Sequence, residues 1–170
     1  MLNTWMPAIV VDDCRTAAAI MKKMLLELGF TAVERHHSAA DAWESMHLNR
    51  YGLVLADIDM APVNGLELLD AIRASETIWT IPVILATASP SHAFECTSAR
   101  CRVGPTALII KPFTATDLRR KLAETMEAAF PKEELLPSNS AKRYDDWAPS
   151  KTRELWENTL RTRLKRLQLN

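Results

Sequence analysis

The chain has 170 residues, of which 48% are hydrophobic and 25% charged, values typical of one globular domain with an appendage. The formal net charge is zero, with 12 Lys and Arg against 15 Asp and Glu in residues 1–130 and 9 against 6 in residues 131–170, so the chain lacks the basic stripe of a nucleic-acid-binding domain. Its three cysteines have no metal-type spacing, and it shows neither a membrane-length apolar run nor a signal-peptide pattern. These features predict a cytoplasmic protein.

Five short apolar runs alternate with amphipathic segments along the first 130 residues. The predicted strands cover residues 8–11, 31–35, 53–56, 81–86 and 107–110. The predicted helices cover residues 14–28, 38–48, 65–75, a poorly amphipathic segment that begins at Ser89-Pro90, and 114–129. Strands that alternate with helices form a parallel sheet covered on both faces. The sequence therefore predicts a three-layer α/β domain that ends near Phe130.

The last forty residues differ in character from this domain. Residues 131–149 are rich in Pro and Ser and are predicted to form an exposed linker. Residues 150–170 are predicted to form an amphipathic helix with Leu160, Leu164 and Leu167 along one side. We expect this helix to serve self-association or a protein partner, and we interpret its basic residues as a solvated polar face.

Four of the five predicted strands end in a chemically distinctive residue. Asp12 and Asp13 follow the first strand, Asp57 the third, Thr87 the fourth and Lys111 the fifth. Each has an ordinary structural explanation when taken alone, such as an acid at a helix N-terminus or a turn after a strand. Parallel strands bring all their carboxyl ends to one edge, where α/β proteins bind ligands. Their joint occurrence therefore predicts a functional site.

The residue types at this edge indicate phosphoryl chemistry. Three crowded carboxylates repel one another unless a cation is present, and a hard divalent ion such as Mg²⁺ suits oxygen ligands. Lys111 would add a second positive charge, and Thr87 a hydroxyl group that can bond a phosphoryl oxygen. Asp57 would then be the nucleophile that forms an acyl phosphate.

Several motifs together resemble the receiver domain of two-component response regulators over about residues 7–130. They are Val10-Val11-Asp12-Asp13, Asp57-Ile58-Asp59-Met60 with Asn64-Gly65, Thr87-Ala88 and Lys111-Pro112-Phe113. The resemblance implies a (βα)5 flavodoxin-like receiver fold with a five-stranded parallel sheet. It also implies a phosphorelay protein that catalyses only its own phosphorylation and dephosphorylation.

The resemblance assigns roles to individual residues. It implies that Asp57 accepts a phosphoryl group from a sensor histidine kinase or a histidine phosphotransfer protein. It implies Mg²⁺ binding by Asp13, Asp57 and the backbone carbonyl of Asp59, with Asp12 reaching the ion through water. Thr87 and Lys111 would hold the phosphoryl oxygens and signal to the face formed by the fourth helix, fifth strand and fifth helix. A downstream effector or a second copy would bind that face.

The chain also departs from the family pattern. The family has Met-Pro after the phosphoacceptor, whereas here Met60 is followed by Ala61 and then Pro62, so the proline has moved one place. Ile109 stands where the family has Tyr or Phe, and Val103-Gly104-Pro105 stands where a small turn is common. These departures leave open a pseudo-receiver that binds partners without phosphorylation. Asp59, two residues beyond Asp57, leaves open a metal-dependent phosphatase. In a receiver, Asp59 would repel phosphate, orient an attacking water, or be a solvated loop acid.

Overall fold

The computed structural model describes residues 6–89, 91 and 106–129, with side chains described as far as residue 125. The chain divides into two compact units, residues 1–130 and 131–170. The predicted linker at 131–149 and the predicted helix at 150–170 lie outside the described residues, as does nearly all of the helix predicted after Ser89-Pro90. None of the helices in the described ranges combines the length and the apolar character that crossing a membrane requires.

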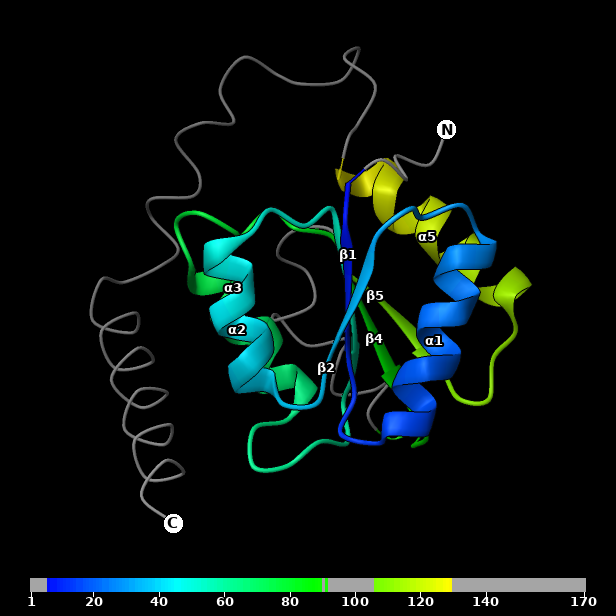
Figure 1. Cartoon of the computed structure of the whole chain (residues 1–170), viewed down its shortest axis with the longest axis horizontal. Helices are drawn as coiled ribbons and strands as arrows, with labels where there is room; N and C mark the ends of the chain where they lie inside the picture. The colour runs from blue at the N-terminus through cyan, green and yellow to red at the C-terminus, as the bar shows by residue number, and fades with distance from the viewer. Residues whose placement is uncertain (1–5, 90, 92–105, 130–170) are drawn as a thin grey trace. The chain divides into compact units, whose positions relative to one another are not determined.

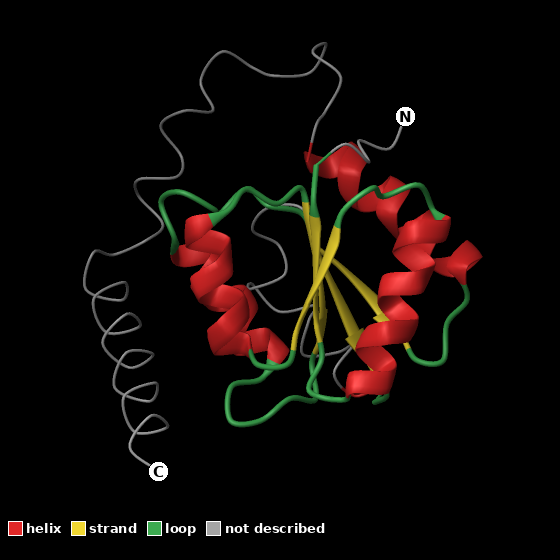
Figure 2. Ribbon diagram, in the orientation of Figure 1, coloured by secondary structure: helices red, strands yellow, loops and turns green. Residues whose placement is uncertain are grey.

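Five parallel strands form one sheet with the order β2-β1-β3-β4-β5. The strands are β1 (Ala8–Val11), β2 (Val33–His36), β3 (Leu53–Asp57), β4 (Val83–Thr87) and β5 (Thr106–Ile110). Figures 1 and 2 show this sheet between two layers of helices, with α2 and α3 on one face and α1 and α5 on the other. The predicted three-layer flavodoxin-like fold is therefore confirmed.

The helices begin close to the residues that the sequence indicates. They are α1 (Arg15–Glu27), α2 (Ala39–Leu48), α3 (Gly65–Ala74) and α5 (Ala115–Ala129). Thr114 and Asp117 cap α5 reciprocally, because each side chain accepts a hydrogen bond from the other's backbone N–H. The apolar residues at 17, 20, 21, 24, 25 and 28 have the spacing of one buried helix face, and for Ile20 that prediction is wrong. Ile20 is 50% exposed, and Ala18 is buried instead.

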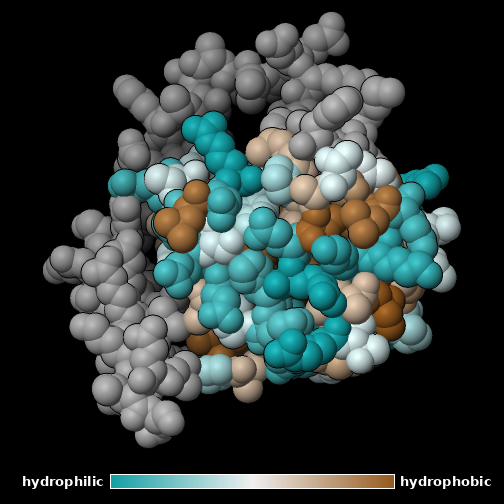
Figure 3. All heavy atoms as spheres, viewed as in Figure 1, coloured by the Kyte–Doolittle hydropathy of each residue, from teal (hydrophilic) through white to brown (hydrophobic). Residues whose placement is uncertain are grey.

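The core lies in two clusters, one on each face of the sheet. Successive side chains of a strand point to opposite faces, so Ile9 and Val54 join the α2 and α3 side while Val10 and Leu55 join the α1 and α5 side. This explains why β1 and β3 are continuous apolar runs rather than alternating ones. The face seen in Figure 3 is largely hydrophilic, with separate hydrophobic patches.

Arg73 is a buried cation near the end of α3. Its guanidinium donates hydrogen bonds to the backbone oxygens of Trp79 (2.7 Å) and Ile81 (2.8 Å) and to Oγ1 of Thr106 (2.8 Å). Burial lowers the pKa of Arg73 to about 10. Arg73 therefore ties α3 to the chain entering β4 and to the first residue of β5.

Candidate phosphoryl-transfer site

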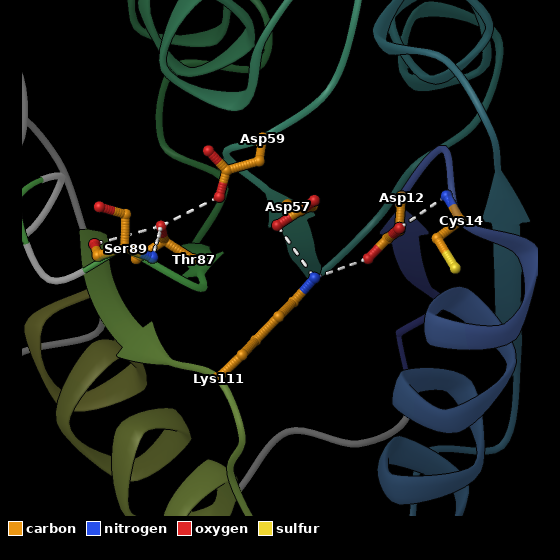
Figure 4. A network of polar contacts seen from close by, with 7 residues as sticks. All are labelled: Asp12, Cys14, Asp57, Asp59, Thr87, Ser89 and Lys111. Atoms are coloured by element: carbon orange, nitrogen blue, oxygen red, sulfur yellow. Dashed lines mark hydrogen bonds and ion pairs between the residues drawn. The ribbon is translucent and has the colours of Figure 1, made fainter.

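The sheet places the predicted residues at one edge. Asp57 and Thr87 are the last residues of β3 and β4, whereas Asp12 and Lys111 directly follow β1 and β5. Parallel pairing sets Asp57 beside Ala86 and Thr87 beside Ile110, so the carboxyl ends of the strands stay level. Figure 4 shows the side chains of Asp12, Asp57 and Lys111 converging in front of these strand ends.

Lys111 bridges two buried carboxylates. Its Nζ lies 2.9 Å from Oδ2 of Asp12 and 2.9 Å from Oδ1 of Asp57. The contact with Asp12 is also a hydrogen bond, and the contact with Oδ1 of Asp57 is an ion pair with a buried carboxylate oxygen. The Asp12 and Asp57 side chains are 1% and 9% exposed. Water therefore screens little of the attraction between these carboxylates and the Lys111 ammonium group.

The loop after β1 fixes Asp12. Oδ1 of Asp12 accepts a hydrogen bond from the backbone N–H of Cys14 at 2.8 Å, and Nδ1 of His37 lies 3.0 Å from the backbone oxygen of Asp12. Both partners were missed by sequence reasoning. His37 directly follows β2, the neighbour of β1, and this position is the only signal that could have suggested the contact.

Asp12, Asp13 and Asp57 form an acidic cluster. Each offers a carboxylate oxygen, and these oxygens all lie within 4.8 Å of one another. Asp13 is exposed, so the cluster opens to solvent on its side. Three hard oxygen donors at this spacing fit Mg²⁺, which binds through few carboxylates and keeps several waters.

Burial and like charge both act on Asp57. Burial raises the pKa of the Asp57 carboxyl group, and the charges of Asp12 and Asp59 raise it further, while Lys111 opposes this shift. For Lys111, burial favours a lower pKa, but its contacts with Asp12 and Asp57 outweigh burial, and the net pKa is raised. The ammonium group therefore stays charged at neutral pH. Ionisation of Asp57 in the folded protein lowers the free energy of unfolding.

Asp57→Asn is therefore expected to gain stability relative to the wild-type protein as the pH rises from the ordinary Asp range toward neutrality, without Mg²⁺. The pKa of Asp57 is higher in the folded than in the unfolded chain, so the folded chain binds more protons in this window and loses stability as they leave. Urea unfolding between pH 4 and 7 (roughly the window above the ordinary Asp pKa), in the presence of a chelator, measures the difference in stability.

Asp117→Asn is the control of opposite sign. Hydrogen bonds from the side chain and backbone of Thr114 lower the pKa of the Asp117 carboxyl group, so its stabilising effect is lost as the pH falls. This variant should lose stability relative to wild type as the pH rises. A stability difference for Asp57→Asn that stays constant or shrinks with rising pH would contradict the burial argument.

The hydroxyl group of Thr87 forms hydrogen bonds with residues of the loops that follow β3 and β4. Its Oγ1 donates a hydrogen bond to Oδ2 of Asp59 at 3.2 Å and accepts one from the backbone N–H of Ser89 at 3.0 Å. Figure 4 shows Thr87 between these two residues, to one side of the Lys111 contacts. Asp59 is exposed, but it is not only a solvated loop acid, because it contacts a predicted site residue.

The loop after Asp57 is closed by Gly65 and Asn64. The backbone N–H of Gly65 donates to the oxygen of Ile58 at 3.0 Å, and Asn64 forms a reciprocal capping box with Glu67. The Asn-x-x-Glu spacing was a sequence signal for this cap that sequence reasoning missed. The Ala61–Pro62 peptide bond within the loop is cis.

Ile109, which departs from the family pattern, is 5% exposed and packs in the core with Leu118 and Leu122.

Comparisons with known proteins identify the family of this chain. The family model for the response regulator receiver domain matches residues 8–123. The chemotaxis protein CheY of Pseudomonas aeruginosa is 30% identical over 122 residues, which are 72% of this chain and 97% of the relative. The chemotaxis protein CheY-3 of Vibrio cholerae is 32% identical over 127 residues, which are 75% of this chain and 96% of the relative.

Solved structures give the same fold. The response regulator protein TrrA of Thermotoga maritima, solved in complex with Mg²⁺-BeF, superposes with a TM-score of 0.61 at 23% identity and covers 71% of this chain and 98% of that one. At this identity the likeness supports the fold alone. The family match spans the five strands and the four strand ends described above. This chain belongs to the response regulator receiver domain family.

Proposed function

We propose that this chain is a phosphorylation switch in which Asp57 accepts a phosphoryl group from a phosphohistidine of a sensor kinase or phosphotransfer protein. The observation that carries the proposal is the Lys111 ammonium group held 2.9 Å from both Asp12 and Asp57 at the ends of parallel strands. Membership of the receiver family supports it. The comparisons do not favour a pseudo-receiver or a phosphatase.

In the transfer step, a carboxylate oxygen of Asp57 attacks phosphorus as the phosphorus–nitrogen bond to histidine breaks. The histidine ring leaves with the bonding electron pair, and Asp57 becomes an acyl phosphate. Water later attacks phosphorus, which restores the carboxylate and releases inorganic phosphate. The protein thus turns over no separate small-molecule substrate. Its own residues contribute position and charge, which suffice for a loose phosphoryl-transfer transition state.

We propose that Asp12, Asp13, Asp57 and the backbone carbonyl of Asp59 serve Mg²⁺ binding. The three carboxylates fit such an ion by donor type and by their spacing within 4.8 Å. When bound, Mg²⁺ neutralises negative charge on the cluster and on the transferring group. Lys111 holds a phosphoryl oxygen from the β5 side, and Thr87 donates its hydroxyl proton to another oxygen once the group is in place.

Intact-mass measurement after incubation with acetyl phosphate and Mg²⁺ tests this function. Wild-type protein should gain about 80 Da, the mass of one phosphoryl group, and should lose it on standing. Asp57→Asn should gain nothing, because the amide is not a nucleophile at this site. Asp41→Asn, which removes an exposed carboxylate at the start of α2, should react like wild type. The function is wrong if the wild-type mass never changes, or if Asp57→Asn reacts equally.

The output of the switch is a second part of the proposal. The phosphorylated protein would engage a protein effector or a second copy through the surface around β5 and α5, or through residues 150–170. Ile110 of β5 is 45% exposed, so an apolar side chain is available at that edge. A cytoplasmic location, predicted from the sequence, completes the proposal.

A further inference from the structure

The hydroxyl group of Thr87 is already in use in the unphosphorylated protein. A hydroxyl group carries one proton, and that of Thr87 faces Oδ2 of Asp59 at 3.2 Å and the backbone oxygen of Ser89 at 3.4 Å. Oγ1 also accepts the N–H of Ser89 at 3.0 Å. Thr87 is 0% exposed, so its hydroxyl group lies inside the protein.

The acceptor oxygen of Asp59 belongs to a carboxylate, so it competes strongly with a phosphoryl oxygen for the hydroxyl proton of Thr87. Hydrogen bonds to a carboxylate are stronger than those between neutral groups. The same carboxylate acts on the nucleophile, since the charge of Asp59 contributes to the raised pKa of Asp57. One side chain thus engages the Thr87 proton and also places negative charge beside the position of an incoming phosphoryl group.

We propose that Asp59 is a positioning residue that holds Thr87 in the unphosphorylated arrangement. This inference rests on the proposed function, in which Thr87 donates its proton to a phosphoryl oxygen. That donation requires the Thr87–Asp59 hydrogen bond to break, so phosphorylation exchanges one acceptor for another. Asp59 therefore biases the protein toward the unphosphorylated state through Thr87, in addition to any repulsion between charges.

A double-mutant cycle on unfolding tests the hydrogen bond itself without any ligand. Asp59→Ala, Thr87→Val and the double variant are compared by urea unfolding in a chelator. Asp59→Ala keeps the backbone carbonyl of residue 59, and Asp59 is exposed, so the variant should fold. The proposal expects non-additive effects, in which each substitution costs less once the other partner is gone. Additive effects would overturn it.

A second cycle measures the competition. The readout is the affinity for fluoroberyllate with Mg²⁺, measured by titration calorimetry on the same four proteins. Asp59→Ala should tighten binding roughly tenfold when Thr87 is present, a change of the size of one charge-assisted hydrogen bond. In the Thr87→Val background the gain should be clearly smaller, because only the relief of charge repulsion remains. Asp59→Asn, which keeps an acceptor oxygen but removes the charge, should fall between wild type and Asp59→Ala.

The outcomes separate the two ideas. An equal gain from Asp59→Ala in both backgrounds would mean that Asp59 acts by charge repulsion alone, and it would overturn the role of Thr87. No gain in either background would overturn the inference as well. A wild-type protein that binds no fluoroberyllate and gains no mass with acetyl phosphate would refute the proposed function, while the unfolding cycle would still decide whether Asp59 holds Thr87.

Discussion

Lys111→Met should bind Mg²⁺ more tightly than wild-type protein while accepting phosphoryl groups more slowly. The Lys111 ammonium group lies 2.9 Å from Asp12 and from Asp57, where it competes with any cation for the same carboxylates. The repulsion between two unit charges about 4 Å apart is about 4 kcal/mol at an effective dielectric constant near 20 and about 1 kcal/mol in bulk water, so at a cluster that opens to solvent we take its removal as about 1.4 kcal/mol. The Mg²⁺ affinity should therefore rise roughly tenfold, since that energy corresponds to a factor of about ten.

The phosphorylation rate should change in the opposite direction. In the transition state the same ammonium group would face the transferring oxygens, and losing such a preorganised charge typically costs about a hundredfold in rate. Titration calorimetry gives the Mg²⁺ affinity, and mass spectrometry with acetyl phosphate gives the rate. If Lys111→Met weakened Mg²⁺ binding, the lysine would not be a competitor of the ion.

Lys121→Met is the matched control for this pair of measurements. Lys121 carries the same charge but lies on α5, where its Nζ contacts Oε2 of Glu124 at 2.9 Å near the surface. The substitution changes the net charge by the same amount as Lys111→Met. Both the Mg²⁺ affinity and the phosphorylation rate should stay close to wild type, because exposed charges away from the site are screened by salt.

The edge of the sheet could be predicted because it depends on short-range signals. An apolar run that stops at an acid predicts a buried strand and locates its carboxyl end to within one residue, as at Val11-Asp12 and Ala56-Asp57. Alternation with helices then makes the strands parallel, and parallel strands share one carboxyl edge. No knowledge of side-chain conformation is needed to place Asp12, Asp57, Thr87 and Lys111 together.

The contacts within the site could not be predicted in the same way. The Thr87–Asp59 hydrogen bond joins residues 28 positions apart, and its formation depends on the path of the loop after β3. The buried guanidinium of Arg73 depends on carbonyl groups that only tertiary folding brings together. The exposure of Ile20 is a further example. The 3.6-residue period of a helix predicts where its apolar stripe is centred but not which residues at the edge of the stripe are buried.

Ile109 departs from the family pattern, and its packing explains how an aliphatic side chain fits at this position. Sequence comparison with the family raised the question of how an aliphatic side chain could replace an aromatic one at this position. Ile109 is 5% exposed and packs in the cluster that contains Leu118 and Leu122. The position therefore contributes to the α5 side of the core. A movement of this side chain cannot report phosphorylation in the way that an aromatic ring could.

Gly65→Ala should be the most destabilising small substitution near the site. A Cβ atom built at Gly65 would lie 2.2 Å from the backbone oxygen of Asp57 and 2.9 Å from the Cα of Ile58. Backbone atoms cannot rotate away as a side chain can, so either the end of β3 or the start of α3 must move. Overpacking of this kind costs about 3 kcal/mol. Urea unfolding of the variant measures that cost.

Gly29→Ala provides the comparison for a purely conformational cost. Gly29 follows α1 with φ of 99°, a conformation that alanine adopts with a penalty of about 1 kcal/mol. Gly65→Ala should therefore cost clearly more than Gly29→Ala, and it alone should slow acetyl phosphate transfer, because the atom it strikes belongs to the nucleophile's own backbone. Equal costs, or normal transfer in Gly65→Ala, would show that the loop gives way without displacing Asp57. The close approach of α3 to β3 thus links the stability of the domain to the position of its reactive carboxylate.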